Sequence, residues 1–266
     1  MLHKAGCSGW SILLPFYNEA GFIGATLRSL AAQTLAPEKI ILVDNGSTDA
    51  SCAEIESVCA EHPGLPIDMR AEERPGKASA LKTGLTFVET PFVATCDADA
   101  YYPPEYLNRC NAMLSRDGGK FVAAVALDDG GAGWKPRLKR ICRAISAALM
   151  PTQAHGGGYA QSFRTDALLA VGGFGPDIWP YCLMDHEVIH RISKVGAVAY
   201  DLRHWCAPSM RRIDRRRVRW SLSERLIYHT VRRRWRDWYF YDYLGPRLAN
   251  RGVSELKLRE KPWLTT

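Results

Sequence analysis

Short apolar runs alternate with amphipathic stretches from residue 11 to about residue 100. The apolar runs cover residues 11–14, 39–43 and 91–95, and amphipathic stretches lie at 21–33 and 50–61. Strands and helices that alternate in this way form βαβ units. We therefore predict an α/β fold whose sheet is mainly parallel and flanked by helices.

The second half of the chain carries further elements of similar size. Residues 121–127 are another strand candidate, 128–133 a glycine-rich loop, and 136–150 an amphipathic helix with a basic start. A loop at 153–158 leads to a helix start at 163–167, and a short helix at about 185–195 precedes a strand at 197–200. The sequence shows no internal repeat and no clear linker before about residue 210, so we expect one large α/β unit up to that point.

Carboxylates follow two of the apolar runs at the point where each run ends. Asp44 closes the run at 39–43, and Asp97 and Asp99 follow the run at 91–95. In open α/β sheets ligands bind at the carboxyl ends of strands, and residues i and i+2 of an extended chain share a face. Two crowded acids need a compensating cation, and Mg²⁺ or Mn²⁺ bound by carboxylates and substrate phosphates fits this need. A single such Asp is also typical of a turn or a helix cap.

Four segments resemble the family-2 glycosyltransferases of the GT-A fold. In the family's order and approximate spacing they are PFYNEAGFIGATLRSLAAQT, IILVDNGSTD, RPGKASALKTGL and FVATCDADAYYPPEYL. The segments GGGYAQSFRTDALLAVGGF and YCLMDHEVIHRISKVG resemble its acceptor side, so the resemblance covers roughly residues 10–215. It implies a GT-A (Rossmann-like) domain over residues 1–212, with a nucleotide half at about 10–100 and an acceptor half at about 101–212. A basic aromatic helical extension would occupy 213–266.

The resemblance also implies a binding site for a nucleoside diphosphate sugar. The residues that would contact this donor are Pro15, Tyr17, Glu19, Asp44, Arg74, Lys77, Asp97, Ala98 and Asp99. Asp44 has the nucleoside role, and Arg74 or Lys77 would reach phosphate or the donor sugar. An exposed first-turn Glu and a solvated basic loop are the ordinary alternatives for Glu19 and for this basic pair.

Asp99 is the candidate ligand for Mn²⁺ or Mg²⁺, and Asp97 would contact ribose or sugar while supporting the metal. His204 is a further candidate ligand, because some relatives carry a late histidine there, and Ser209 competes for the same position. The metal would offset charge on the departing diphosphate.

Asp185 falls where the family carries its catalytic base. The usual Glu-Asp pair is changed here, since Met184 takes the first position, and Glu187 is the runner-up for the base. A base that deprotonates a hydroxyl acceptor as it attacks implies single displacement, and therefore inversion. The glycines that would approach the sugar or acceptor closely are Gly156, Gly157 and Gly158.

Basic charge is concentrated near the C-terminus. Residues 203–236 contain twelve Arg and two acids, a net charge of +10, whereas the whole chain carries +7 and the remainder therefore −3. Arg219 lies in a near match to the Gln-x-x-Arg-Trp motif of processive members and is a candidate diphosphate contact. Arginines interleaved with Trp220, Trp235 and Trp238 are typical of an interfacial helix on anionic lipid. A helix that packs its aromatics on the domain, or an oligomer contact, remains open.

Composition limits the compartment and the rival functions. The 266 residues include no apolar run long enough to span a bilayer, and eight cysteines without a Cys-x-x-Cys pair are typical of reduced thiols. We expect a cytoplasmic protein, with peripheral contact at the inner face of the plasma membrane in view of the arginines. A nucleotidyltransferase is the enzymatic alternative, and a nucleic-acid- or membrane-binding module the non-enzymatic one. The −3 balance outside the arginine segment argues against nucleic acid as a partner.

Overall fold

The computed structural model describes residues 9–128, 134–209, 220–254 and 256. Seven of the described strands form one sheet in the order β3-β2-β1-β4-β8-β6-β9. Their bounds are β1 (Trp10–Phe16), β2 (Lys39–Asp44), β3 (Ile67–Ala71), β4 (Phe92–Thr95), β6 (Phe121–Val125), β8 (Gln161–Arg164) and β9 (Ala197–Ala199). Only β8 runs antiparallel to its neighbours, β4 and β6. The predicted mixed, mainly parallel sheet is therefore confirmed.

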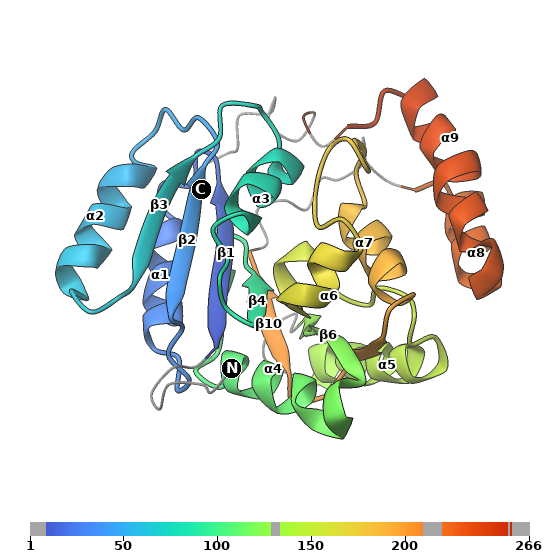
Figure 1. Ribbon diagram of the computed structural model, residues 1–266, viewed down its shortest axis with the longest axis horizontal. Coiled ribbons are helices and arrows are strands. Elements are labelled where there is room, and N and C mark those ends of the chain that lie inside the picture. The colour runs from blue at the N-terminus through green and yellow to red at the C-terminus, as the bar shows by residue number, and fades with distance from the viewer. Residues whose placement is uncertain (1–8, 129–133, 210–219, 255, 257–266) are drawn as a thin grey trace.

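Helices cover both faces of this sheet, as Figure 1 shows. They are α1 (Ile23–Ala31), α2 (Ser51–Glu61), α3 (Lys77–Leu85), α4 (Tyr106–Leu114), α5 (Trp134–Leu149), α6 (Thr165–Ala170) and α7 (Met184–Ile192). Successive side chains of a strand point to opposite faces. Ile12 of β1 accordingly packs in the cluster with α1, α2 and α4, whereas Leu13 packs in the cluster with α3, α6 and α7.

A small second sheet, β5-β10-β7, joins segments that are distant in sequence. Its strands are β5 (Ala100–Tyr101), β7 (Leu127–Asp128) and β10 (Trp205–Pro208). Because β5 directly follows the Asp-x-Asp segment, its pairing with β10 brings the chain near residue 209 to these acids.

The C-terminal segment packs beside α7 (Figure 1). It contains α8 (Leu222–Thr230), a 3-10 turn (Arg233–Trp235), a π-helix (Trp238–Leu244) and α9 (Gly245–Asn250). Tyr228, Tyr239 and Phe240 are buried in a third apolar cluster with Trp179. These three aromatic side chains pack on the domain, which was one of the alternatives considered for this segment. Trp235 and Trp238 stay exposed. The expected boundary at residue 212 and Arg219 lie outside the described residues.

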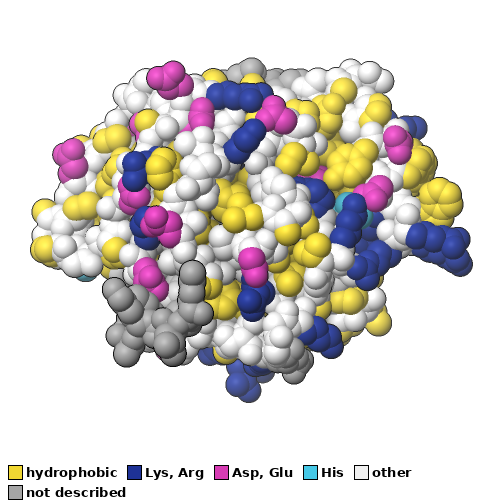
Figure 2. Space-filling view, viewed as in Figure 1, with side chains coloured by type: hydrophobic (Ala, Val, Ile, Leu, Met, Phe, Trp, Pro, Cys, Tyr) yellow, Lys and Arg dark blue, Asp and Glu magenta, His cyan; other side chains and the backbone are white. Residues whose placement is uncertain are grey.

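Basic side chains gather on one side of the surface (Figure 2), over the region where α7 and α8 lie in Figure 1. In the described segments no helix is both long and apolar enough to span a bilayer.

Candidate active site

The acids predicted from the sequence lie at one edge of the sheet. β1 pairs in parallel with β2 and with β4, and Phe16, at the end of β1, is in register with Asp44. β4 ends at Thr95, directly before the Asp-x-Asp segment. The carboxyl ends of neighbouring parallel strands therefore bring Asp44 and the segment 96–99 to the same edge.

Asp97 forms an ion pair with Lys77, the first residue of α3. Its backbone N–H donates to the Tyr102 hydroxyl at 2.9 Å, and that hydroxyl donates to the Tyr159 carbonyl at 2.9 Å. Thr26 of α1 donates to the carbonyls of Ala98 and Ala100 at 2.8 and 2.9 Å. The Asp-x-Asp segment is thus fixed from two sides, and the Lys77 ammonium compensates one of its two charges.

Asp99 is held by Ser209. The Ser209 hydroxyl donates to Asp99 Oδ2 at 2.7 Å, and the Ser209 N–H donates to the Asp99 carbonyl at 2.8 Å. Pairing of β5 with β10 produces this contact. Of the two residues that competed for the position beside Asp99, the structure therefore brings Ser209 to the carboxylate.

His204 lies in the core instead, and its prediction as a metal ligand is wrong. Its side chain is fully buried, its ring centroid lies 4.7 Å from that of Tyr106, and Nε2 lies 3.3 Å from Cys110 Sγ. Burial lowers the pKa of His204 to about 3, so the ring is neutral. It has the role of a packed core histidine.

Asp185 and the glycine loop meet at Lys77. A Cβ atom added at Gly158 would lie 3.6 Å from Asp185 Cβ and 3.6 Å from Lys77 Nζ. Thr95 donates to the Gly158 carbonyl at 2.7 Å, which ties the loop to the end of β4. The structure therefore joins Lys77, Asp97, Gly158 and Asp185 in one cluster, from four separate segments of the chain.

The neighbouring glycines have structural reasons of their own. A Cβ at Gly156 would approach the Ala126 carbonyl to 2.5 Å, and one at Gly157 would approach the Tyr159 ring to 2.4 Å. Close packing against the end of β6 favours glycine at position 156, and close packing against the Tyr159 ring favours it at position 157. Gly158 alone of the three faces the cluster.

The backbone at the start of α7 is strained. Leu183 adopts φ 72°, the left-handed region that non-glycine residues rarely occupy, and it caps the helix whose first turn carries Asp185. Gln161 of β8 donates to the Asp185 carbonyl at 2.9 Å and anchors this turn. Strain of this kind persists where surrounding contacts fix it and is common at functional sites.

Glu187, the alternative base, is fully buried and engaged. Its two oxygens accept from Arg191 Nε at 2.7 Å and Nη2 at 2.9 Å, and Tyr241 donates to Oε1 at 2.5 Å. These bonds occupy the carboxylate and exclude solvent from it. These contacts argue against the runner-up assignment to Glu187, because they use its carboxylate to join α7 to the C-terminal segment.

The loop before Lys77 is held by Asn45, a residue that the sequence argument did not single out. Asn45 is buried, and its amide donates to the carbonyls of Glu72 and Arg74 at 2.8 and 2.9 Å. Its Oδ1 accepts from the Gly76 N–H at 2.7 Å. Arg74 itself lies 3.6 Å from Asp177 and is well exposed, and its ion pair is with this residue rather than with the acids of the Lys77 cluster.

The remaining predicted donor residues follow the end of β1. Pro15 is in register with Val43 of β2, and Tyr17 is half-buried in the loop that follows. Glu19 is only 4% exposed, in contrast to the exposed first-turn Glu considered as its alternative. Ser51 at the start of α2 accepts from the Glu19 N–H at 2.8 Å, which ties this loop to the one after β2.

The described part of the chain offers few metal ligands of its own. The described residues contain no group of three or more His, Cys, Asp or Glu that could enclose a metal ion. Asp99 and the Ser209 hydroxyl supply oxygen donors at one point. This donor set fits Mg²⁺ or Mn²⁺ of the kind that keeps water and substrate phosphate in its coordination sphere.

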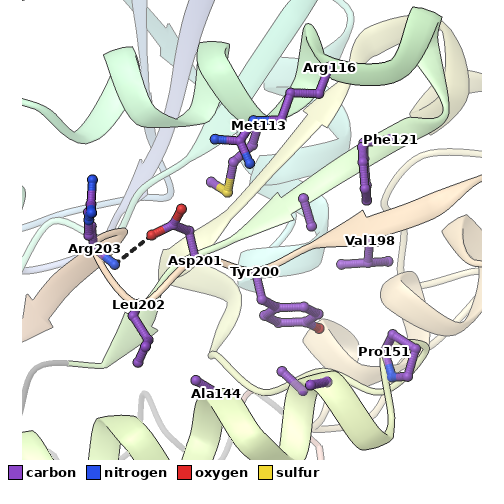
Figure 3. A pocket seen from close by; sticks show the side chains of 13 residues that line it. Met113, Arg116, Phe121, Ala144, Pro151, Val198, Tyr200, Asp201, Leu202 and Arg203 are labelled. Atoms are coloured by element: carbon purple, nitrogen blue, oxygen red, sulfur yellow. Dashed lines mark hydrogen bonds between the residues drawn. The ribbon is translucent and has the colours of Figure 1, made fainter.

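A separate open cavity of about 700 Å³ lies between α4, α5 and the chain after β9 (Figure 3). Its lining includes Met113, Phe121, Ala147, Tyr200 and Arg203, and none of the predicted site residues. It is therefore distinct from the cluster at the carboxyl ends of the strands.

Comparisons with known proteins agree with this geometry. The family model described as "Glycosyl transferase family 2" matches residues 11–171. The undecaprenyl-phosphate 4-deoxy-4-formamido-L-arabinose transferase of Serratia proteamaculans (strain 568) is 34% identical over 135 residues, which cover 49% of this chain and 41% of that protein. The succinoglycan biosynthesis protein ExoU of Rhizobium meliloti (strain 1021) is 30% identical over 112 residues, 42% of this chain and 31% of that protein. The chain thus spans less than half the length of these curated relatives.

Solved structures show the same fold. The mannosyltransferase PcManGT from Pyrobaculum calidifontis, in complex with GDP-Man and Mn²⁺, superposes with a TM-score of 0.69 at 23% identity, covering 90% of this chain and 68% of that one. S. aureus TarS 1-349 in complex with UDP-GlcNAc gives a TM-score of 0.59 at 17% identity, covering 90% and 72%. The family model covers more than half of the chain and the sheet has the fold of these GT-A structures, so the protein belongs to glycosyl transferase family 2.

Proposed function

We propose that this glycosyltransferase moves one sugar from a nucleoside diphosphate sugar to a hydroxyl acceptor, with inversion and with Mn²⁺ or Mg²⁺ as cofactor. The observation that carries the proposal is the meeting of Lys77, Asp97, Gly158 and Asp185 beside Asp99. Transfer needs a counter-charge for the leaving diphosphate and a base for the acceptor. This cluster has a cation and carboxylates suited to both tasks.

The donor half of the proposal uses the edge formed by β1, β2 and β4. Asp44 accepts from a nucleobase N–H or ribose hydroxyl, and Pro15, Tyr17 and Glu19 line the start of the cleft. Lys77 contacts phosphate once the donor competes for its pairing with Asp97. A metal at Asp99 would stabilise the negative charge that develops on the diphosphate. The structurally similar mannosyltransferase was solved in complex with Mn²⁺, which supports a divalent cation as cofactor here.

The acceptor half places Asp185 as general base. The carboxylate stands in the first turn of α7, next to Gly158, and takes the proton of the attacking hydroxyl. Glu187 is occupied by Arg191 and Tyr241, which leaves Asp185 as the carboxylate of this helix for that role. A base on the acceptor side and single displacement together produce inversion at the anomeric carbon.

The acceptor is proposed to be lipid-linked or part of a surface glycan. Several curated relatives are named as transferases that act on undecaprenyl phosphate, which favours a polyprenyl phosphate as a second candidate acceptor. With a lipid-linked acceptor the chain would act peripherally at a membrane surface. The two acceptors differ chemically, because a phosphate is already ionised near neutral pH and needs no general base.

Asp185→Asn tests both the base and the acceptor class. With a hydroxyl acceptor we expect donor binding to persist and transfer to fall by about a hundredfold or more, the range for loss of a general base. With a polyprenyl phosphate acceptor the loss should be small. The measurement is transfer rate and donor affinity for the variant on both acceptor types.

Asp166→Asn is the matched control, since Asp166 is also a first-turn acid but lies exposed on α6. It should leave both transfer and donor binding unchanged. Loss of transfer in the control as large as in Asp185→Asn, or full activity of Asp185→Asn on every hydroxyl acceptor, would contradict the assignment.

A further inference from the structure

Helix α5 presents its large apolar side chains to solvent. Trp134, Leu138, Ile141, Ile145 and Leu149 are 71, 52, 38, 55 and 76% exposed. They recur at intervals of three or four residues, so they form one continuous row, here called the α5 stripe, along a single face of the helix. Single exposed apolar residues are ordinary on a protein surface, whereas a contiguous row marks an interaction site.

The opposite face of α5 is the one turned toward the domain. Ala147 is buried there, and Ala144, Arg140 and Arg143 are half-buried. Ala144 and Ala147 line the cavity of Figure 3, which separates the helix from the end of α4 and the chain after β9. A helix that packs on its own domain turns its large apolar face inward. The orientation of α5 is the reverse, so its apolar face has a different partner.

The charge of α5 identifies the partner. The helix sequence WKPRLKRICRAISAAL contains five Lys or Arg residues and no acid. A basic amphipathic helix with an apolar face and a Trp at one end has the composition of helices that lie in the interface of anionic membranes. A second copy of the chain on the same face would bring the exposed basic side chains beside the stripe, such as Arg137 and Lys139, against their own copies, which opposes association.

We propose that α5 docks the protein on an anionic phospholipid surface, with the α5 stripe in the acyl boundary and the flanking basic side chains at the head groups. This assigns the membrane contact to α5, whereas the sequence placed it in the arginines of 203–236. The loop that follows α5 is bonded to that segment, since Arg236 donates to Thr152 and Gln153 bonds to Tyr228 and His229.

The docking helix is also joined to the acceptor side of the proposed site by a short loop. The chain leaves α5 at Leu149 and reaches Gly158, beside Asp185, nine residues later. The docking does not depend on the proposed transfer, because it can be measured without donor or acceptor.

Co-sedimentation with vesicles of equal parts phosphatidylglycerol and phosphatidylcholine tests the proposal. Wild type should bind, and binding should weaken with salt because the basic side chains contribute electrostatically. The double variant Leu138→Gln and Ile145→Gln keeps every charge but removes two apolar contacts from the stripe. Its partition onto vesicles should fall by about tenfold or more.

The matched control is Leu222→Gln with Leu226→Gln on α8, two leucines 88 and 64% exposed and one turn apart. It should bind vesicles like wild type. Because all four side chains are exposed, thermal unfolding should stay close to wild type in both variants. Absence of wild-type binding at low salt overturns the proposal, and so does loss of binding in the α8 variant alone, which would return the contact to the C-terminal segment.

A second measurement locates the contact. Acyl chains brominated near the head group should quench Trp fluorescence of bound wild type, and Trp134→Phe should reduce the quenched fraction. Trp235→Phe, at a 54% exposed tryptophan outside α5, should leave it unchanged. Wild-type quenching in Trp134→Phe, or a dimer that Leu138→Gln with Ile145→Gln dissolves without altering vesicle binding, would contradict docking through α5.

Discussion

Asp99 has two roles that point mutants can separate: it accepts a hydrogen bond from Ser209, and it is the expected ligand of the metal ion. Asp99→Ala should abolish metal-dependent donor binding because the remaining carboxylate, Asp97, is paired with Lys77. Calorimetric titration with a nucleoside diphosphate sugar, with and without Mn²⁺, measures this. Ser209→Ala keeps the carboxylate and should retain metal dependence, whereas unchanged affinity in Asp99→Ala would refute the metal assignment.

Glu187 should affect the fold more than the chemistry. Glu187→Gln leaves Arg191 buried without its counter-charge and weakens the acceptor of the Tyr241 hydroxyl. Removing one partner of a buried ion pair costs about 3–5 kcal/mol. We expect a clear drop in the denaturation midpoint, while kcat of the folded fraction is largely kept. A variant as stable as wild type that loses transfer by two orders of magnitude would make Glu187 the base after all.

At the residue scale the sequence predicted positions better than partners. Asp44, Asp97 and Asp99 could be placed because each closes an apolar run, a local signal. The sequence could not decide between His204 and Ser209 beside the metal, or between Asp185 and Glu187 as the base. These roles depend on which residues, distant in sequence, lie beside each side chain. Cys110 stands 94 residues from His204, and Ser209 stands 110 residues from Asp99. No periodicity within one segment encodes such pairs.

At the element scale the segment 72–76 depends on one amide. Asn45 makes three hydrogen bonds to its backbone, and Gly76, at φ 125°, turns the chain into α3 just before Lys77. Asn45→Ala should weaken donor binding by about tenfold, since Lys77 loses its fixed position, and each lost bond also costs about 1 kcal/mol of stability. Donor titration and urea unfolding measure the two effects.

Asn45→Asp is the discriminating variant for this segment. The aspartate keeps the oxygen that accepts from the Gly76 N–H but loses both N–H groups that donate to carbonyls. The affinity of this variant for the sugar nucleotide should therefore fall between those of wild type and Asn45→Ala. Ser47→Ala, in the same turn, removes only the acceptor of the Asn18 N–H and should have a smaller effect. Wild-type donor affinity in Asn45→Ala would show that Lys77 is positioned by other contacts.

Element existence was largely predictable, and the direction in which elements face was not. The helix expected over 136–150 is present as α5 (Trp134–Leu149), and the helix expected near 185–195 is α7 (Met184–Ile192). Periodicity shows that α5 has an apolar face but not that this face points outward. The aromatic C-terminal segment posed the converse problem, because Tyr239 and Phe240 are buried against Trp179, which lies sixty residues earlier. Both outcomes depend on tertiary packing.

At the scale of the whole molecule, buried histidines make stability depend on pH. Full or partial burial lowers the pKa of His155, His186, His190 and His204 below the ordinary value of 6.5. Below that value the unfolded chain binds protons that the folded chain does not. Acid therefore favours unfolding, so the stability that these histidines contribute is complete above pH 6.5 and declines as the pH falls.

His204 allows this dependence to be measured for a single group. With its pKa at about 3 in the folded state and 6.5 in the unfolded chain, it alone should cost about 2 kcal/mol of unfolding free energy between pH 8 and pH 5. His204→Phe keeps a ring against Tyr106 but cannot take up a proton. Urea unfolding should show that the free energy of unfolding lost between pH 8 and pH 5 is smaller in the variant by about that amount. This holds whatever the stability of the variant at pH 8. An equal loss in both proteins would mean that His204 is protonated in the folded core.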